Sequence, residues 1–206
     1  MKSLIIMAIP GSGKTSFSKK HKGSFDFDGW FWENVALPNG YKLGDPRGNE
    51  LFLKELDKLY KSNKYKYILC PILLYGMQPV RNVLLTKYNT LTIYPSKELK
   101  NEWIERLKDR GDHPSNKDNH FIPFWESHFI EVSDILDKEG LGKTNYVKLD
   151  LRHKYLEDGF NIWKKRIGIT VENCHITIDS CDSTITLDEF WKKNHMSDHI
   201  WGFKDL

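Results

Sequence analysis

Short runs of apolar residues alternate along the chain with longer segments whose apolar positions recur every three or four residues. A short apolar, β-branched run predicts a buried strand, and the longer spacing predicts a helix with one apolar face. The predicted strands cover residues 4–9, 24–28, 67–74, 90–94 and 145–149. The predicted helices cover residues 14–23, 49–62, 78–87, 97–110, 123–138 and 155–166. This alternation predicts an α/β fold, a doubly wound parallel sheet with helices on both faces.

Two details limit this prediction. Residues 29–48 contain Gly, Pro and Asn without a steady period, so we expect a loop with one helical turn there. Pro71 lies inside the predicted strand over 67–74, although a central strand needs the N–H group that proline lacks.

The pattern changes after about residue 150. Residues 1–150 carry the alternation of strands and helices, and we expect residues 151–206 to form a small C-terminal α+β extension packed on or beside that domain. Within the extension, β-rich segments occur at 167–178 and 184–187, and an amphipathic helix is predicted at 188–194.

The C-terminal extension also contains a possible set of zinc ligands, namely Cys174, Cys181, His195 and His199. The two histidines are one helical turn apart, as a ligand pair would be. The two cysteines are too far apart for the usual zinc knuckle. We therefore favour ordinary packing of these side chains over zinc binding.

The composition narrows the class of protein. Of 206 residues, 39% are hydrophobic and 29% are charged, which is enough apolar side chain for a core. The formal net charge of +3 is too small an excess to indicate a nucleic-acid binder. No apolar run reaches the roughly 18 residues of a membrane span. Three irregularly spaced cysteines favour a reducing compartment. We therefore expect a cytoplasmic protein that is not bound to a membrane.

The strongest motif follows the first predicted strand. Residues 8–15 read Ala-Ile-Pro-Gly-Ser-Gly-Lys-Thr and lead directly into a predicted helix, the context of a phosphate-binding P-loop. The glycines let the backbone curl so that successive N–H groups point into one concavity. Lys14 can then reach the β- and γ-phosphates of a nucleotide, and the Thr15 hydroxyl can bind Mg²⁺. The predicted cofactors are ATP and Mg²⁺, and the predicted nucleotide-binding residues are Gly11, Ser12, Gly13, Lys14, Thr15 and Ser16.

At these residues the chain resembles the P-loop kinases, in particular small phage-encoded kinases of the nucleotide and polynucleotide type. The wider pattern of strands and helices extends the resemblance over roughly residues 1–150. Ala8 departs from the family pattern, because it stands where the first glycine is usual. The resemblance implies a nucleotide-kinase-like P-loop NTPase fold with ATP at the carboxyl ends of the strands, and it implies a catalytic role for Lys14.

Two aspartates follow the P-loop helix. Asp26 and Asp28 end the predicted strand over 24–28, and residues two apart on a strand share a face. Shikimate-type kinases have a similar Asp-x-Asp, and the resemblance implies that one carboxylate assists Mg²⁺ while the other binds or deprotonates the acceptor. We assign Asp26 with Thr15 to the metal and Asp28 to catalysis, with both as candidate substrate contacts. The alternative is that Asp26 and Asp28 are a structural pair at the end of a strand.

The predicted strand over 67–74 lacks the Walker B aspartate that we expected on it.

Four arginines fall where nucleotide kinases place contacts to substrate and lid. Arg47 and Arg81 are candidate substrate-binding residues, because a planar guanidinium suits bidentate phosphate binding. Arg106 and Arg110 are one helical turn apart, on the face opposite the apolar stripe of the helix over 97–110. The resemblance to adenylate and thymidylate kinases implies a lid over residues 111–122 that brings these two catalytic arginines to the transferring phosphoryl group. A solvated helix face is the alternative.

These features predict an ATP-dependent phosphotransferase, most simply a kinase whose acceptor is a nucleoside monophosphate or a nucleoside. A kinase acting on nucleic acid, at a 5′-hydroxyl or a hydroxymethylated base, is the first alternative. A nucleotide-binding regulator without turnover is the second. We expect a monomer or a homodimer in the cytoplasm, which would be that of the host cell for a phage-encoded protein.

Overall fold

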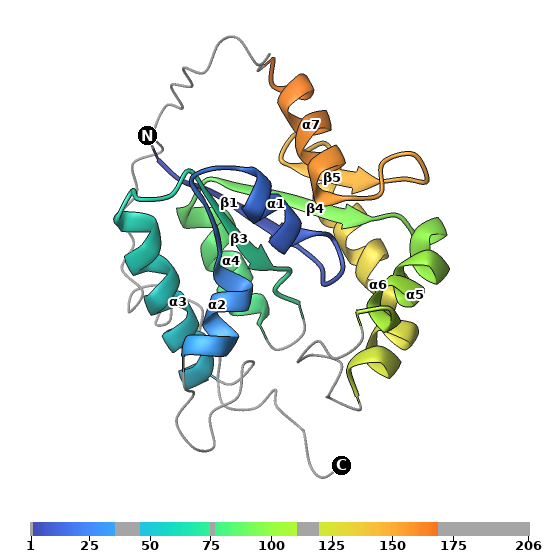
Figure 1. Cartoon of the computed structure of the whole chain (residues 1–206), viewed down its shortest axis with the longest axis horizontal. Coiled ribbons are helices and arrows are strands. Elements are labelled where there is room, and N and C mark those ends of the chain that lie inside the picture. Colours follow the sequence, from blue (N-terminus) through green and yellow to red (C-terminus); the bar gives the residue numbers. More distant parts are fainter. Residues whose placement is uncertain (1, 36–45, 75–76, 111–119, 169–206) are drawn as a thin grey trace. The chain divides into compact units, whose positions relative to one another are not determined.

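The computed structural model describes residues 2–35, 46–74, 77–110 and 120–168, which form a parallel sheet of five strands with helices on both faces (Figure 1). The strands are β1 (Leu4–Ala8), β2 (Ser24–Asp26), β3 (Tyr67–Pro71), β4 (Thr90–Pro95) and β5 (Tyr146–Leu149). The helices are α1 (Lys14–Lys20), α2 (Phe27–Asn34), α3 (Pro46–Lys61), α4 (Gln78–Lys87), the 3-10 turn η1 (Lys97–Leu99), α5 (Lys100–Lys108), α6 (Phe121–Gly140) and α7 (Leu156–Arg166). The predicted α/β fold is confirmed.

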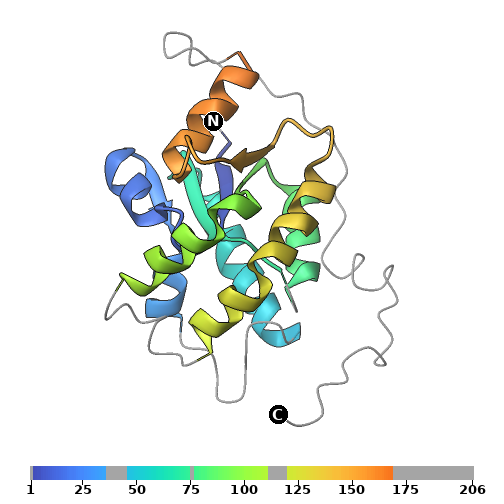
Figure 2. The ribbon, with the colours of Figure 1, turned by 90° about the vertical axis from the view of Figure 1, so that its right-hand side faces the viewer.

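Strand β1 lies at the centre of the sheet, whose order is β2-β3-β1-β4-β5. It pairs in parallel with β3 on one side and β4 on the other, and all five of its residues are buried. Helices α1 and α7 cover one face of the sheet, whereas α3, α4 and α6 cover the other (Figures 1 and 2). The chain crosses from one half of the sheet to the other beside β1, so the loop after β1 begins at a topological switch point, where α/β proteins bind ligands.

The segment after β1 and α1 differs from the sequence prediction. Strand β2 ends at Asp26, and α2 begins at Phe27, where we expected two more strand residues and then a loop. Asp26 caps α2, because its Oδ1 accepts a hydrogen bond of 3.3 Å from the backbone N–H of Gly29. Phe27 and Phe31 are one turn apart and fully buried, and both pack against Phe52 of α3. The hydrophobic pair at helical spacing outweighs the alternation that predicted a strand.

Other element boundaries shift by smaller amounts. Strand β3 ends at Pro71 instead of residue 74, consistent with the missing N–H group of proline. The helix expected over 97–110 is divided into η1 and α5. No helix within the described ranges is long and apolar enough to cross a membrane.

The division of the chain into residues 1–150 and residues 151–206 stays a prediction. The described residues all belong to the first compact unit of the chain. Helix α7, which the sequence analysis placed in the extension, packs against β4 and β5 of the first unit. The possible zinc ligands Cys174, Cys181, His195 and His199 lie outside the described residues, as do residues 111–119 of the predicted lid. Residues 121 and 122 of that lid belong to α6.

The close packing of α7 on the sheet requires a glycine at position 159. A Cβ atom at Gly159 would lie 2.6 Å from Cγ2 of Ile93 and 3.0 Å from Cδ2 of Leu149. We expect Gly159→Ala to lower the free energy of unfolding by about 1–3 kcal/mol, because α7 or the sheet must shift. Thermal or denaturant unfolding measures this.

Gly29→Ala is the matched control, because its nearest neighbour would be Cγ of Asp26 at 3.7 Å and alanine suits a helix. Equal stability of the two variants would show that α7 does not need this close approach.

Candidate active site

The P-loop leaves the carboxyl end of β1 in the conformation that its glycines permit. Gly11 and Gly13 have φ values of 80° and 93°, a region that other residues rarely adopt. Gly11 also lies close to α5, since a Cβ atom there would be 2.9 Å from Cδ2 of Leu107 and 3.1 Å from Nε1 of Trp103. Ala8 replaces the usual first glycine without strain, because it is the buried last residue of β1.

The backbone of this loop retains hydrogen-bond donors. Among the described residues, the N–H groups of Gly11, Gly13, Lys14, Thr15 and Ser16 donate to no backbone carbonyl. The Ser12 hydroxyl is buried and has no hydrogen-bond partner. Buried donors without partners are rare in folded proteins, and a concavity of backbone N–H groups suits the oxygens of phosphates. The loop therefore fits the phosphate groups of a nucleotide.

Lys14 is turned back onto the loop and is 8% exposed. Its Nζ donates to the carbonyl oxygens of Ala8 and Ile9 at 3.2 and 3.3 Å, and it lies 3.0 Å from Oδ2 of Asp28, which is 18% exposed. The ion pair is largely shielded from water, so it is screened less than a surface pair. The two predicted catalytic residues Lys14 and Asp28 are thus in direct contact.

Thr15 and Asp26, the predicted metal ligands, also lie together. The Thr15 hydroxyl donates a hydrogen bond of 2.9 Å to Oδ2 of Asp26. A hydroxyl and a carboxylate supply the oxygen ligands that Mg²⁺ prefers, and Mg²⁺ often takes one or two protein ligands together with substrate phosphates. No group of three or more His, Cys, Asp or Glu side chains in the described ranges could hold a metal ion. The pair fits Mg²⁺ that also binds phosphate oxygens.

Asp26 and Asp28 reach the P-loop by a different route from the one predicted. We expected them to share a face of one strand, but Asp26 ends β2 and Asp28 lies in the first turn of α2. The short connection between strand and helix still directs Asp26 to Thr15 and Asp28 to Lys14.

Two further residues, Arg110 and Cys70, interact electrostatically with Asp28. Partial burial lowers the pKa of Arg110, and the negative charge of Asp28 opposes that change, so the two groups act on one another electrostatically. Cys70 lies on β3, the strand that was expected to supply a Walker B aspartate. Burial raises the pKa of the Cys70 thiol well above its ordinary value, and the charge of Asp28 raises it further. Cys70 is therefore a neutral neighbour of the site.

Arg106 does not lie on a solvated helix face, which was one interpretation of the sequence, and its carboxylate partner is Glu102 in the same helix. Its side chain is 17% exposed. The guanidinium lies over the rings of Trp103 and Tyr155, 4.6 and 4.4 Å from their centroids, and donates to the backbone carbonyls of Gly11 and Lys154. Arg106 thus contacts the outside of the P-loop. The roles of Trp103 and Tyr155 could not be predicted from the sequence, because Trp103 is one residue of an apolar stripe there.

Arg81, a candidate substrate contact, is held by other side chains of the protein, and its role as a substrate contact stays a prediction. It is fully buried, its Nη2 is 2.5 Å from Oε2 of Glu139, and it also donates to the hydroxyl of Tyr146 at 3.3 Å. It therefore joins α4, α6 and β5. Arg47 is exposed in the first turn of α3, and its role as a substrate contact stays a prediction.

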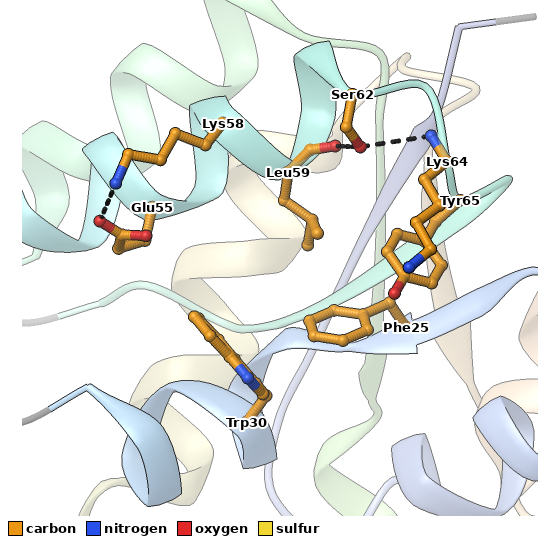
Figure 3. A pocket seen from close by; sticks show the side chains of 8 residues that line it. All are labelled: Phe25, Trp30, Glu55, Lys58, Leu59, Ser62, Lys64 and Tyr65. Atoms are coloured by element: carbon orange, nitrogen blue, oxygen red, sulfur yellow. Dashed lines mark hydrogen bonds and ion pairs between the residues drawn. The ribbon is translucent and has the colours of Figure 1, made fainter.

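A separate pocket of about 270 Å³ lies between α3 and the segment from β2 to α2 (Figure 3). Phe25, Trp30 and Tyr65 present aromatic rings to it, and Lys58 and Lys64 also line it. Trp30 is two residues beyond Asp28 in α2, which places the two side chains on opposite sides of the helix. The pocket is therefore distinct from the P-loop site.

Comparisons with known proteins find only limited similarity to this chain. No family model matches the chain. The chain is 27% identical over 119 residues to a protein translocase subunit SecA of Maridesulfovibrio salexigens, and the match covers 50% of this chain but only 14% of that protein. Among solved structures, the tunicamycin resistance protein of Deinococcus radiodurans has a TM-score of 0.49 at 16% identity, covering 82% of this chain and 98% of the other. A gluconokinase from Sinorhizobium meliloti has a TM-score of 0.46 at 14% identity, covering 80% and 93%. The proposed function therefore rests on the residues of the site.

The buried pair of Arg81 and Glu139 generates a test of its structural role. Two nitrogen atoms of Arg81, Nε and Nη1, have no hydrogen-bond partner, whereas Glu139 is 27% exposed. We expect Glu139→Ala to lower the free energy of unfolding by about 3 kcal/mol, because it leaves an unpaired charge in the core. Arg81→Met should cost less, because it removes that charge altogether. Denaturant unfolding of both variants measures the difference.

Arg47→Met is the control on an exposed arginine, and we expect it to leave stability unchanged. If the Arg81→Met protein is stable but its KM for an acceptor is raised, the result would support Arg81 as a substrate contact.

Proposed function

We propose that this chain is an ATP-dependent P-loop kinase that transfers a phosphoryl group to a small acceptor. One observation carries the proposal: at the loop after the carboxyl end of β1, Lys14 contacts Asp28 and Thr15 contacts Asp26, and the charge of Asp28 also acts on Arg110. Phosphoryl transfer needs little covalent chemistry from the protein and depends on cations and positioning. This set supplies cations for the phosphates, oxygen ligands for a metal and a carboxylate for the acceptor.

Each residue has a role that follows from its place. Lys14 exchanges its contacts with Asp28 and two carbonyls for the phosphates of ATP. Thr15 and Asp26 would hold Mg²⁺, which would neutralise charge on the phosphates. Arg110, whose pKa is lowered by burial and raised by the negative charge of Asp28, would stabilise charge on the phosphoryl group during transfer. The lid expected over residues 111–122 would bring Arg110 further into the site.

Asp28 is the candidate general base. When Lys14 turns to the phosphates, the carboxylate loses its partner and becomes available to accept a proton from an acceptor hydroxyl. We favour a nucleoside monophosphate or a nucleoside as the acceptor, with Arg47 as a possible contact to an acceptor phosphate. A phosphate acceptor would need binding and orientation by these groups instead of proton removal.

A kinase acting on nucleic acid is the second candidate, and the pocket in Figure 3 is the observation in its favour. Its three aromatic rings and two lysines are the residue types that stack bases and attract a phosphate backbone. One observation counts against this candidate, because Nζ of Lys58 already forms an ion pair with Glu55 at 2.6 Å.

The deciding experiment measures ADP production from ATP and Mg²⁺ with a panel of acceptors. Turnover with nucleoside monophosphates or nucleosides supports the first proposal, and turnover with 5′-hydroxyl or hydroxymethylated DNA alone supports the second. Binding of ATP without turnover on any acceptor would support a nucleotide-binding regulator and contradict both kinases. Trp30→Ala is a useful companion, since it should impair only the use of nucleic acid.

Lys14→Ala tests the assignment of the P-loop. We expect turnover to fall by about 10²–10³-fold, because the variant loses a positioned charge on the transferring phosphoryl group. The loop should keep its shape, which depends on Gly11 and Gly13. Steady-state rates at saturating ATP and Mg²⁺ measure the effect, and circular dichroism verifies the fold. Wild-type turnover in this variant would overturn the kinase proposal.

Asp28→Asn and Asp26→Asn separate the two carboxylates when the acceptor is a hydroxyl. We expect Asp28→Asn to lower kcat by about 10²–10⁴-fold, since an amide cannot accept the proton. Its affinity for ATP should not fall, because Lys14 no longer has to leave a carboxylate. Asp26→Asn should instead raise the Mg²⁺ concentration needed for half-maximal activity. If both variants stay within a fewfold of the wild-type kcat, the pair is structural.

A further inference from the structure

Three consecutive carbonyl groups of the P-loop are held from outside the loop. The carbonyl oxygen of Pro10 accepts a hydrogen bond of 2.7 Å from Nε1 of Trp103 in α5. That of Gly11 accepts one of 3.4 Å from Nη1 of Arg106, also in α5. That of Ser12 accepts one of 2.8 Å from the backbone N–H of Leu156 at the start of α7. Helix α5 thus binds the first two of these carbonyls and the start of α7 binds the third, although the two helices are far apart in the sequence.

The orientation of these carbonyls determines where the neighbouring N–H groups point. In a planar trans peptide, the C=O of one residue and the N–H of the next point in opposite directions. Carbonyls of Pro10, Gly11 and Ser12 that face α5 and α7 therefore turn the next three N–H groups toward the inside of the loop. The N–H of Ser12 bonds to the carbonyl of Ile9 at 3.3 Å. The N–H groups of Gly11 and Gly13 also point toward the inside of the loop, where they can donate to phosphate oxygens.

The groups that hold the loop are themselves fixed. Trp103 is fully buried. The guanidinium of Arg106 lies over the rings of Trp103 and Tyr155, and it also bonds to the Lys154 carbonyl at 3.1 Å and to Glu102 at 2.9 Å. The backbone N–H groups of Lys154 and Tyr155 both donate to Oδ2 of Asp158, which fixes the chain just before Leu156. Rigid supports of this kind reduce the entropy lost when a ligand binds.

We propose that Trp103 and Arg106 are positioning residues that set the affinity of the P-loop for nucleotide phosphates without touching the nucleotide. This inference rests on the proposed function and changes the role assigned to Arg106. A catalytic arginine acts on the transition state and alters kcat. An arginine that holds the loop in shape alters the binding of ATP and ADP alike and leaves kcat at saturation nearly unchanged.

The test measures the Kd of ADP and of ATP by calorimetry for Trp103→Phe and Arg106→Lys. The first variant keeps the packed ring and loses the indole N–H. The second keeps the charge and loses the planar fork. We expect each Kd to rise by about five- to tenfold, the effect of one lost hydrogen bond. The kcat at saturating ATP should stay within about twofold. Trp125→Phe, in α6 and without a hydrogen bond to the loop, is the matched control with unchanged affinity.

The outcomes separate this inference from the proposed function. Unchanged Kd values in both variants, with a wild type that binds and turns over ATP, overturn the inference alone. A tenfold or larger loss of kcat in Arg106→Lys at unchanged Kd also overturns it and restores the catalytic role. A wild type that binds neither ATP nor ADP overturns both. If Trp103→Phe fails to fold, Arg106→Lys alone tests the inference. That variant should fold, because Arg106 is partly exposed and lysine keeps its charge.

Discussion

The pairing of β1 with a parallel strand on each side fixes the place where the P-loop begins. Because the strand is buried along its whole length and hydrogen-bonded to both β3 and β4, the chain leaves the sheet at one defined point. Strand β2 runs in the same direction, so its carboxyl end returns Asp26 and Asp28 to the same edge. The site therefore depends on the register of the sheet before it depends on any single contact between side chains.

The charges at that edge are nearly balanced without a ligand. Lys14 and Arg110 are opposed by Asp26 and Asp28, and the closest pair is largely out of water. Such a pair gains little net free energy, because the attraction is offset by the loss of hydration of both groups. Phosphates that replace the carboxylate as the partner of Lys14 therefore do not have to overcome a strongly favourable contact.

The sequence was sufficient for the fold class and for the expectation that Lys14, Thr15, Asp26 and Asp28 lie together, whereas their roles stay predictions. Glycine spacing and strand–helix alternation are local signals, and they were reliable here. Arg81 and Arg106 show the limit, since the sequence identifies an arginine but not whether its partner is a phosphate, Glu139 or the carbonyl of Gly11. The start of α2 could have been found, because Phe27 and Phe31 have helical spacing and Asp26 is a good helix cap.

The neutral Cys70 on β3 has a consequence for the order of events. Strand β3 has the neutral Cys70 instead of an acidic residue that could also have paired with Lys14. Asp28 is therefore the carboxylate in contact with Lys14. One carboxylate cannot neutralise the lysine and receive a proton from an acceptor at the same moment. In the proposed kinase, a nucleotide that draws Lys14 away would free Asp28 to accept a proton, whereas an acceptor that arrives first would find Asp28 paired with Lys14. Ordered addition, with the nucleotide binding first, would follow from a neutral cysteine on β3, the strand where an acidic side chain was expected.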